Sequence, residues 1–301
     1  MKQKNHRFSV VDILLIAMMI APIVFMIVLK VLTTPVSEGI SISGARIYFT
    51  IPMPIQDLPI TESQVNSWSV MVILFGLCLF LTRNLRTTDI SARQHLAEWI
   101  VEKVDHLVLD SMGEFFASFS PLIASIIGLS AFSSLMSLFG LHSATSDMNV
   151  VAGWAILVFG LITHYKLKSG PLQYAKGFTE PVAILTPFNI ISEFATPVSM
   201  AFRHYGNVLS GSVIAVLVAS GLQGLSSMIF GWLPGILGEF PILQVGIPAI
   251  LSIYFDLFSS CLQAYIFAML TMMYVSDGFS LDDYEKRKMK KLQKKQLKNS
   301  N

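Results

Sequence analysis

Apolar residues occur in long runs along the chain, and the lengths of these runs predict helices that cross a membrane. A membrane-spanning helix needs about 20 mostly apolar residues. Six segments meet or approach this length, although the second and fourth need flanking residues: Val10–Leu32, Trp68–Leu81, Phe119–Leu141, Val150–Tyr165, Val182–Leu222 and Phe240–Val275. We therefore expect an all-α, polytopic membrane protein with about six membrane helices.

The last two apolar runs are too long for simple crossings. As a helix, Val182–Leu222 would extend for about 60 Å, against a bilayer core of about 30 Å. Phe240–Val275 is similarly long. Pro187 and Pro197 can divide or kink the first of the two, and a steep tilt or a partly flat hairpin would absorb the excess length. We expect these two segments to form a long tilted hairpin.

Two regions between the apolar runs have different patterns. Thr34–Asn66 is rich in Pro, Gly and Ser, which predicts an ordered outer loop rather than a helix. In Asp89–Glu114, apolar residues recur at helical spacing while charged residues occupy the other faces. This segment is predicted to be an amphipathic helix, either along the membrane surface or packed on a partner subunit. We expect one membrane domain over 1–301, with a first helix at 10–32, an outer loop at 34–66, a core at 67–276 and a basic cytoplasmic tail at 277–301.

The composition supports a membrane protein. The chain is 53% hydrophobic and only 13% charged, with a mean hydropathy of +0.63, whereas soluble domains carry about 25% charged residues. Cys78 and Cys261 both lie in apolar runs. We interpret them as small buried hydrophobic residues, so no disulfide framework is expected.

Positive charge is unevenly distributed, and its distribution predicts the topology. With the N-terminus inside and six crossings, the inner regions hold every Lys and Arg except Lys30, Arg46 and Arg203. Cytoplasmic segments of membrane proteins carry the excess of Lys and Arg. We therefore expect both the N-terminus and the C-terminus to be cytoplasmic.

Arg203 is the residue that most requires a functional explanation. It is the only Lys or Arg in residues 177–239, and a guanidinium near a bilayer centre costs roughly 2.5–3.5 kcal/mol on insertion scales. Small and polar residues share its helix face at a period of about 3.6, namely Thr196, Ser199, Asn207 and Ser210. Such a face lets another helix pass closely. An arginine in this position is suited to meet a carboxylate.

The sixth apolar segment carries a polar stripe of its own. Spacings of four, three and four residues place its members on one helix face: Ser252, Asp256, Ser259 and Gln263. Asp256 is the only carboxylate between Glu239 and Asp277. Desolvation raises the pKa of a buried carboxylate and a nearby cation lowers it, so such a group can exchange protons near working pH. The stripe predicts either a proton or ion path or a structural Arg203–Asp256 ion pair between two helices.

Two further ionisable residues lie on the Arg203 segment. His204 points about 100° round the helix from Arg203, and we interpret it either as an interhelical hydrogen-bonding group or as a proton relay. Glu193 precedes Arg203 by about 15 Å along the helix axis. It either lines an aqueous entrance or marks the level at which the helix leaves the headgroups.

Several motifs of catalytic and binding sites do not occur in the sequence. There is no GxxxxGK[ST] phosphate-binding loop and no HExxH, GxSxG or CxxC motif. The histidines are scattered and form no cluster typical of a metal site. We expect no catalytic site within this chain alone, no cofactor, no metal and no nucleic-acid partner.

One stretch of the sequence resembles a known signature. PVSMAFRHYGNVLSG, at 197–211, resembles that of subunit a of F-type rotary ATP synthases, in which an arginine is followed by Leu-Phe-Gly-Asn and a pair of small residues. FNIISEFATP before it and LQAYIFAMLTMMYVS after it are similar to the last two helices of that family. LAEWIVEKVDHLV, SATSDMN and THYKLKSG fit its middle, so the resemblance covers roughly 66–276. The first helix and the Pro-rich loop are similar to those of longer bacterial versions.

This resemblance implies a stator subunit of a bacterial cytoplasmic (inner) membrane. Its tilted hairpin would face a rotating ring of small c-type subunits, with a peripheral-stalk b-type subunit and membrane lipid as further partners. Two offset half-channels would bring ions, expected to be protons, to the ring carboxylates, and ring rotation would drive ATP synthesis. Arg203 would separate the half-channels, because guanidinium does not deprotonate at accessible pH. The implied ion-path residues are Asn207, Asp256, Gln263, Glu193, Ser212 and His204.

The sequence departs from the family pattern at three places. His204-Tyr205 replaces Leu-Phe, Ser212 stands where many members have Glu or His, and Asp256 stands where members often carry an ionisable group. These departures imply that the carboxylate of the inlet half-channel lies on the sixth helix alone. Two other interpretations remain: a secondary transporter that binds an anionic solute at Arg203, for which no inverted repeats are seen, and a non-conducting scaffold whose polar stripes only join helices.

Overall fold

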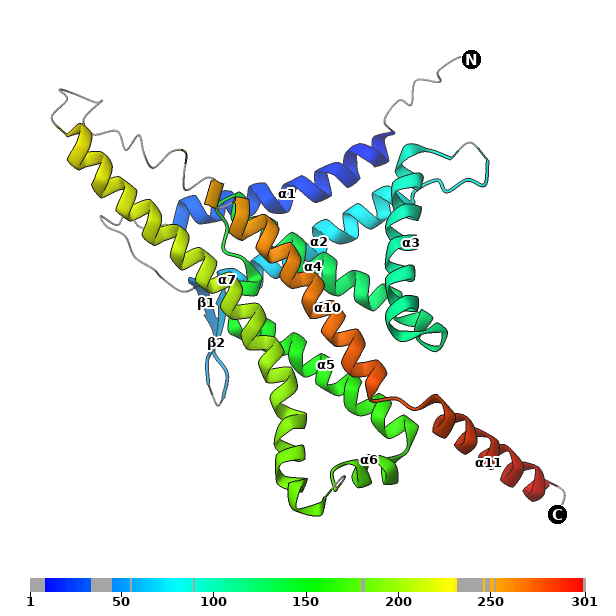
Figure 1. The fold of residues 1–301 in the computed structure, drawn as a ribbon. Helices are drawn as coiled ribbons and strands as arrows, with labels where there is room; N and C mark the ends of the chain where they lie inside the picture. The colour runs from blue at the N-terminus through cyan, green and yellow to red at the C-terminus, as the bar shows by residue number, and fades with distance from the viewer. Residues whose placement is uncertain are drawn as a thin grey trace.

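The computed structural model describes residues 9–33, 45–54, 56–88, 90–179, 182–231, 246, 250–251 and 253–299 of the 301-residue chain. Helices make up nearly all of the regular structure in these residues (Figure 1). Six helical segments of the described part are long and apolar enough to cross a membrane: Val10–Thr33, Glu62–Thr82, Glu114–Leu138, Met148–Ser169, Thr186–Phe230 and Ile253–Asp277. The expected all-α, polytopic membrane fold is confirmed.

The first two long helices, α1 (Val10–Thr33) and α2 (Glu62–Thr82), pack along each other. The sequence between them was expected to be a loop, but part of it forms an antiparallel hairpin of β1 (Ile47–Ile51) and β2 (Leu58–Thr61). The loop prediction is therefore wrong over these two strands. β-branched and aromatic residues in β1 favour an extended chain, and Pro59 is tolerated because a two-stranded sheet consists only of edge strands.

The amphipathic segment forms α3 (Ala92–Met112), close to the predicted range. Its start is capped by Ser91, whose hydroxyl accepts the N–H of Gln94 at 3.3 Å. It ends at Gly113, where φ is +81° and glycine is favoured. Val108 and Met112 are buried in the core, and α3 crosses the ends of α1 and α2 at a steep angle (Figure 1). Its position on the membrane surface stays a prediction.

The middle of the chain supplies two spanning helices and a short connection. A 3-10 turn, η1 (Glu114–Phe119), leads into α4 (Ser120–Leu138), and the 3-10 turn η2 (Ala144–Ser146) joins α4 to α5 (Met148–Ser169). A short helix, α6 (Pro171–Gly177), then turns the chain back towards the next helix. The sequence had not predicted α6.

The fifth spanning helix, α7 (Thr186–Phe230), follows the turn η3 (Ala183–Leu185) and contains 45 residues. Pro187 lies in its first turn, where no N–H is needed for the helix. Pro197 lies inside the helix without dividing it, and α7 bends along its course (Figure 1). This helix is longer than the segment predicted for it, because it continues to Phe230.

The sixth span is formed by η4 (Ile253–Ser259), a π-helical turn, and α10 (Ser260–Asp277). Both pack against α7, as expected for the last two spans. Ser252 and most of 240–251 in the predicted segment lie outside the described residues. α10 is central in the bundle: six of its side chains are at most 1% exposed, namely Ala264, Phe267, Ala268, Thr271, Met272 and Val275. The basic tail contains a further helix, α11 (Leu281–Asn299).

Candidate functional site

Arg203 lies on an exposed face of α7. Ser199 and Ser210 on the same helix are also exposed, as is Phe202 beside it. Among the side chains that the structure describes, none forms an ion pair or a hydrogen bond with the Arg203 guanidinium. The guanidinium is therefore presented outward from this chain, where a group on another chain can reach it.

The next residue along the helix faces the interior. His204 is 1% exposed, and its Nε2 lies 3.2 Å from Ser130 Oγ of α4. Its ring also contacts the rings of Trp154 of α5 and Phe267 of α10. Nδ1 is enclosed and has no hydrogen-bond partner in the described structure. His204 thus joins three helices while one of its ring nitrogens stays unsatisfied.

The polar stripes of α7 and the sixth span meet through two side chains. Asn207 Nδ2 lies 2.9 Å from Ser259 Oγ, and Asn207 Oδ1 accepts from the same hydroxyl at 3.2 Å. One turn further along α7, Gly211 brings its backbone close to Phe255. A glycine at this point allows the two helices to approach closely. The sequence had placed Asn207 and Ser259 on polar faces, and the structure shows that these faces pack together.

The other residues predicted on these two polar stripes differ in their surroundings. Gln263, one turn beyond Ser259 on α10, is buried at 6% exposure. Ser212 is exposed, and its hydroxyl donates to the carbonyl of Leu209 in its own helix at 2.8 Å. The backbone of Asp256 lies in the π-helical turn η4, a structure often found at functional sites. Its side chain lies outside the described part of the structure.

Glu193 lies on the first part of α7 and is ion-paired. Lys166 of α5 approaches its carboxylate at 2.7 Å, and the Tyr174 hydroxyl donates to it at 3.4 Å. Burial, followed by the nearby Glu193 carboxylate, raises the pKa of Tyr174 above its ordinary value. Beside this ion pair is an open hollow of about 340 Å³, lined in part by Lys166, Tyr174 and Asp277. Lys166 thus neutralises Glu193.

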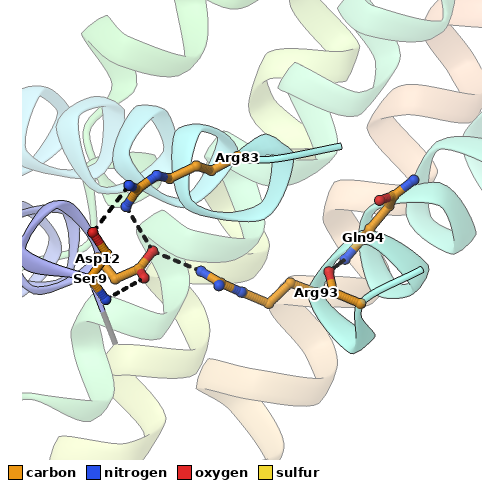
Figure 2. Close-up of polar contacts among 6 residues, drawn as sticks. Ser9, Asp12, Arg83, Arg93 and Gln94 are labelled. Atoms are coloured by element: carbon orange, nitrogen blue, oxygen red, sulfur yellow. Dashed lines mark hydrogen bonds and ion pairs between the residues drawn. The ribbon is translucent and has the colours of Figure 1, made fainter. Parts of the chain in front are cut away.

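A charged cluster that the sequence did not predict lies at the start of the first helix. Asp12 is 4% exposed and receives Arg83 Nη1 at 3.1 Å and Arg93 Nη1 at 2.9 Å (Figure 2). It also accepts the backbone N–H of Ser9 at 3.0 Å and so caps its own helix. One carboxylate thereby joins α1 to the end of α2 and the start of α3. The only signal in the sequence was an isolated acid inside the first apolar run.

These observations define an integral membrane protein in which polar side chains are concentrated where two long spanning helices pack. Within the described residues, no group of three or more His, Cys, Asp or Glu side chains could hold a metal ion. The charged groups that stand out are instead an exposed arginine and a neutralised carboxylate on α7.

Comparisons with known proteins identify the family. A family model described as ATP synthase A chain matches residues 64–276. ATP synthase subunit a of Anoxybacillus flavithermus is 31% identical over 223 residues, which cover 70% of this chain and 88% of the relative. ATP synthase subunit a 1 of Crocosphaera subtropica is 28% identical over 220 residues, covering 72% and 86%. A sodium ion specific ATP synthase subunit a, from Propionigenium modestum, is 26% identical over 275 residues, covering 81% and 88%.

The chain therefore belongs to the ATP synthase subunit a family. Its role lies in ion translocation by the membrane sector of that complex, in which it works together with other subunits. The resemblance identified from the Arg203 segment is confirmed. The roles of the individual site residues stay proposals.

Proposed function

We propose that this chain is the proton-conducting stator subunit of a bacterial F-type ATP synthase. A ring of c-type subunits passes the exposed face of α7, and each ring carboxylate in turn meets Arg203. Protons reach the ring from one side and leave it to the other through two offset half-channels. Ring rotation then couples this flow to ATP synthesis, and a b-type subunit holds the chain in the stator.

The observation that carries this proposal is the outward position of Arg203. An arginine inside a membrane normally pairs with a carboxylate or faces a wet cavity, because its burial is costly. Arg203 is exposed on a spanning helix and has no partner among the described side chains. A carboxylate supplied by another chain would satisfy it. Because guanidinium stays protonated, it would release a proton from that carboxylate without carrying the proton onward.

The ion-path residues are proposed in two groups on either side of Arg203. Glu193 and the hollow beside its ion pair belong to the cytoplasmic half-channel. Asn207, Ser212, Asp256 and Gln263 belong to the outer half-channel, and His204 is the buried group next to them. We place both termini in the cytoplasm of a bacterium with the chain in its inner membrane, since this orientation leaves few basic residues outside.

The test is ATP-driven proton pumping by the assembled ATP synthase in inverted membrane vesicles. Arg203→Ala is expected to abolish pumping while the variant still inserts and copurifies with the ring. Arg86→Ala is the matched control, because Arg86 is an exposed arginine beyond the end of α2. Normal pumping by Arg203→Ala would contradict the proposed stator role.

The transported ion is tested by the same assay. A subunit a similar to this chain is described as sodium ion specific, so sodium is the second candidate. Acidification of the vesicles in sodium-free buffer is expected if protons are transported. Uptake of labelled sodium without acidification of the vesicles would assign sodium instead.

A further inference from the structure

The basic tail helix α11 has no role in the site proposed above. It begins at Leu281, whereas the match to the family model ends at residue 276, so the family does not account for it. Three of its residues are acidic and eight are basic, the basic ones being Lys286, Arg287, Lys288, Lys290, Lys291, Lys294, Lys295 and Lys298. On the proposed topology this helix lies on the cytoplasmic side.

The start of α11 is fastened to the end of α5. The Ser169 hydroxyl donates to the carbonyl of Ser280 at 3.3 Å and accepts the backbone N–H of the same residue at 3.2 Å. Two turns further on, Arg287 Nη1 donates to the carbonyl of Lys168 at 3.4 Å. These bonds fix the first turns of α11 next to the end of a spanning helix.

Aromatic rings and a lysine surround the same point. Lys168 Nζ lies over three rings, at 5.2–5.5 Å from their centroids: Phe115, Tyr165 and Tyr284. Tyr284 belongs to α11, and its ring also contacts that of Phe279. Tyrosine and lysine side chains at the end of a spanning helix are typical of the membrane–water interface. We therefore place the first turns of α11 at the level of the lipid headgroups.

Beyond these turns, α11 extends away from the other helices, so its faces are open to a partner (Figure 1). Met289 and Leu292 are 59% and 49% exposed. At 100° per residue they lie within about 60° of each other on the helix surface. Lys290 is exposed on another face, about 160° from Leu292. Glu285 precedes the apolar pair by one turn, so the apolar face begins only beyond it.

The combination of charge and apolar side chains favours an anionic phospholipid surface as the partner. A cluster of about four to eight Lys or Arg immediately cytoplasmic of a spanning helix is typical of segments that bind anionic lipid headgroups. An acidic protein surface would satisfy the charges but leave Met289 and Leu292 exposed. The boundary between headgroups and acyl chains accepts both kinds of side chain. A solvated tail would need neither the apolar pair nor the bonds that fix its start.

We infer that α11 is a docking helix for anionic phospholipids of the cytoplasmic leaflet. Its lysine and arginine side chains bind the lipid phosphates, while Met289 and Leu292 enter the boundary between headgroups and acyl chains. The inference rests on the cytoplasmic position of the C-terminus in the proposed function. It concerns a part of the chain outside the Arg203 site and requires no proton transport.

The test uses an environment-sensitive fluorophore on α11 of the purified complex in vesicles. Cys78 and Cys261 are first replaced by alanine, and the fluorophore is attached to Leu292→Cys. Gln293→Cys is the matched control, because it is in the same turn but about 100° further round the helix. The vesicles contain phosphatidylcholine alone or phosphatidylcholine mixed with phosphatidylglycerol, which is anionic.

The emission of Leu292→Cys is expected to shift to the blue in vesicles with phosphatidylglycerol, and nitroxide-labelled lipid should quench it. Gln293→Cys should show a smaller shift, and added salt should reverse the shift of Leu292→Cys because it screens exposed charges. Equal emission of Leu292→Cys in both kinds of vesicle would overturn the inference. A blue shift in both would then assign the apolar pair to a protein contact, and a shift in neither would make α11 a solvated tail.

Charge is tested by a triple variant of α11, Lys286→Gln, Lys288→Gln and Lys290→Gln. Each Lys or Arg near an anionic surface strengthens binding about fivefold, so this variant should bind the lipid on the order of a hundredfold more weakly and lose the shift. The matched control removes three exposed basic residues elsewhere on the proposed cytoplasmic side and should keep the shift: Arg86→Gln, Lys103→Gln and Lys176→Gln.

A shift of the parent size in the α11 triple variant would overturn the inference. Fluorescence needs no turnover by the complex. Failure of the lipid test would thus leave the proposed function standing, whereas normal pumping by Arg203→Ala would overturn that function whatever the fluorophore reports.

Discussion

Asn207 and Ser259 join the two longest apolar segments of the chain through side-chain hydrogen bonds of 2.9 and 3.2 Å. Asn207 lies one turn beyond Arg203 on α7, and Ser259 ends the π-helical turn η4. The contact links α7 to the sixth span one turn from Arg203, which is exposed, and next to His204, which is buried.

Removal of either partner of this contact is expected to have the same effect as removal of both. Asn207→Ala and Ser259→Ala should each lower the stability of the purified complex by about 1 kcal/mol, and the double variant should lose little more than either single one. Thermal unfolding of all three variants measures the coupling, expected to be about 0.5–1.5 kcal/mol. Ser227 provides the control, because its hydroxyl donates to the carbonyl of Gly224 within α7. Ser227→Ala should therefore combine additively with Asn207→Ala.

Gly211 is predicted to be the least tolerant glycine of α7. A Cβ at this position would lie 3.1 Å from Phe255 Cβ and Cδ1, so the helices must shift to accept alanine. Gly211→Val would force α7 away from η4 and destabilise the packing by about 1–3 kcal/mol. The melting temperature of the purified complex and its pumping rate should both fall.

The matched variant is Gly221→Ala, also on α7. A Cβ there would meet nothing within 4 Å, and alanine is favoured over glycine in a helix by about 1 kcal/mol. This variant should therefore be at least as stable as the parent. Equal loss of stability in Gly211→Val and Gly221→Ala would show that the effect does not come from contact with Phe255.

Helices could be predicted where a short stretch of sequence carries the signal, such as the length or the period of an apolar run. The lengths of the apolar runs located α1, α4 and α5, and the 3.6-residue period located α3. The β-hairpin was missed because its prolines, typical of loops, obscured a short run of β-branched and aromatic residues. The helix in the basic tail was missed because a run of like charges predicts a solvated chain.

For the site, the sequence predicted only which residues share a face of the same helix. Spacing placed Arg203 and Asn207 on one polar face and Ser259 on another, and the structure brings Asn207 and Ser259 together. The partners of Glu193 and His204 were not predictable, because Lys166 and Ser130 are distant in sequence. Such pairs depend on how helices pack, which residue spacing does not specify.

The Asp12 cluster is predicted to hold α1 in place. Asp12→Asn would leave Arg83 and Arg93 facing each other without the carboxylate that joins them (Figure 2). Water reaches both arginines here, so we expect Asp12→Asn to lower stability by less than the loss of a fully buried ion pair would. Thermal unfolding of the purified complex measures it.

Salt provides an independent check on this cluster. Ion pairs reached by solvent weaken as ionic strength rises. The parent complex should therefore lose more stability in high salt than Asp12→Asn does. Asp12→Asn with the stability and salt dependence of the parent would show that α1 is held by apolar packing alone.

His142 is predicted to make the loop between α4 and α5 sensitive to acid. It lies between η2 and the end of α4, and burial holds its pKa below the ordinary value of 6.5, although the nearby Glu62 and Asp147 carboxylates act in the opposite direction. Lys30 also lowers it. As the pH falls below 6.5, an unfolded His142 takes up a proton before the folded one does. Protonation therefore favours the unfolded loop, and stability is lost on acidification.

The measurement is thermal unfolding of the purified complex between about pH 5 and pH 8, where histidine charge changes. Stability should be constant above pH 6.5 and should decline below it, and His142→Asn should reduce this decline because asparagine does not titrate. His106→Asn is the control, since it removes an exposed histidine of α3 and leaves the loop intact. If both variants kept the decline of the parent, acid sensitivity would arise from other groups. A smaller decline in His142→Asn alone would assign it to the loop between α4 and α5.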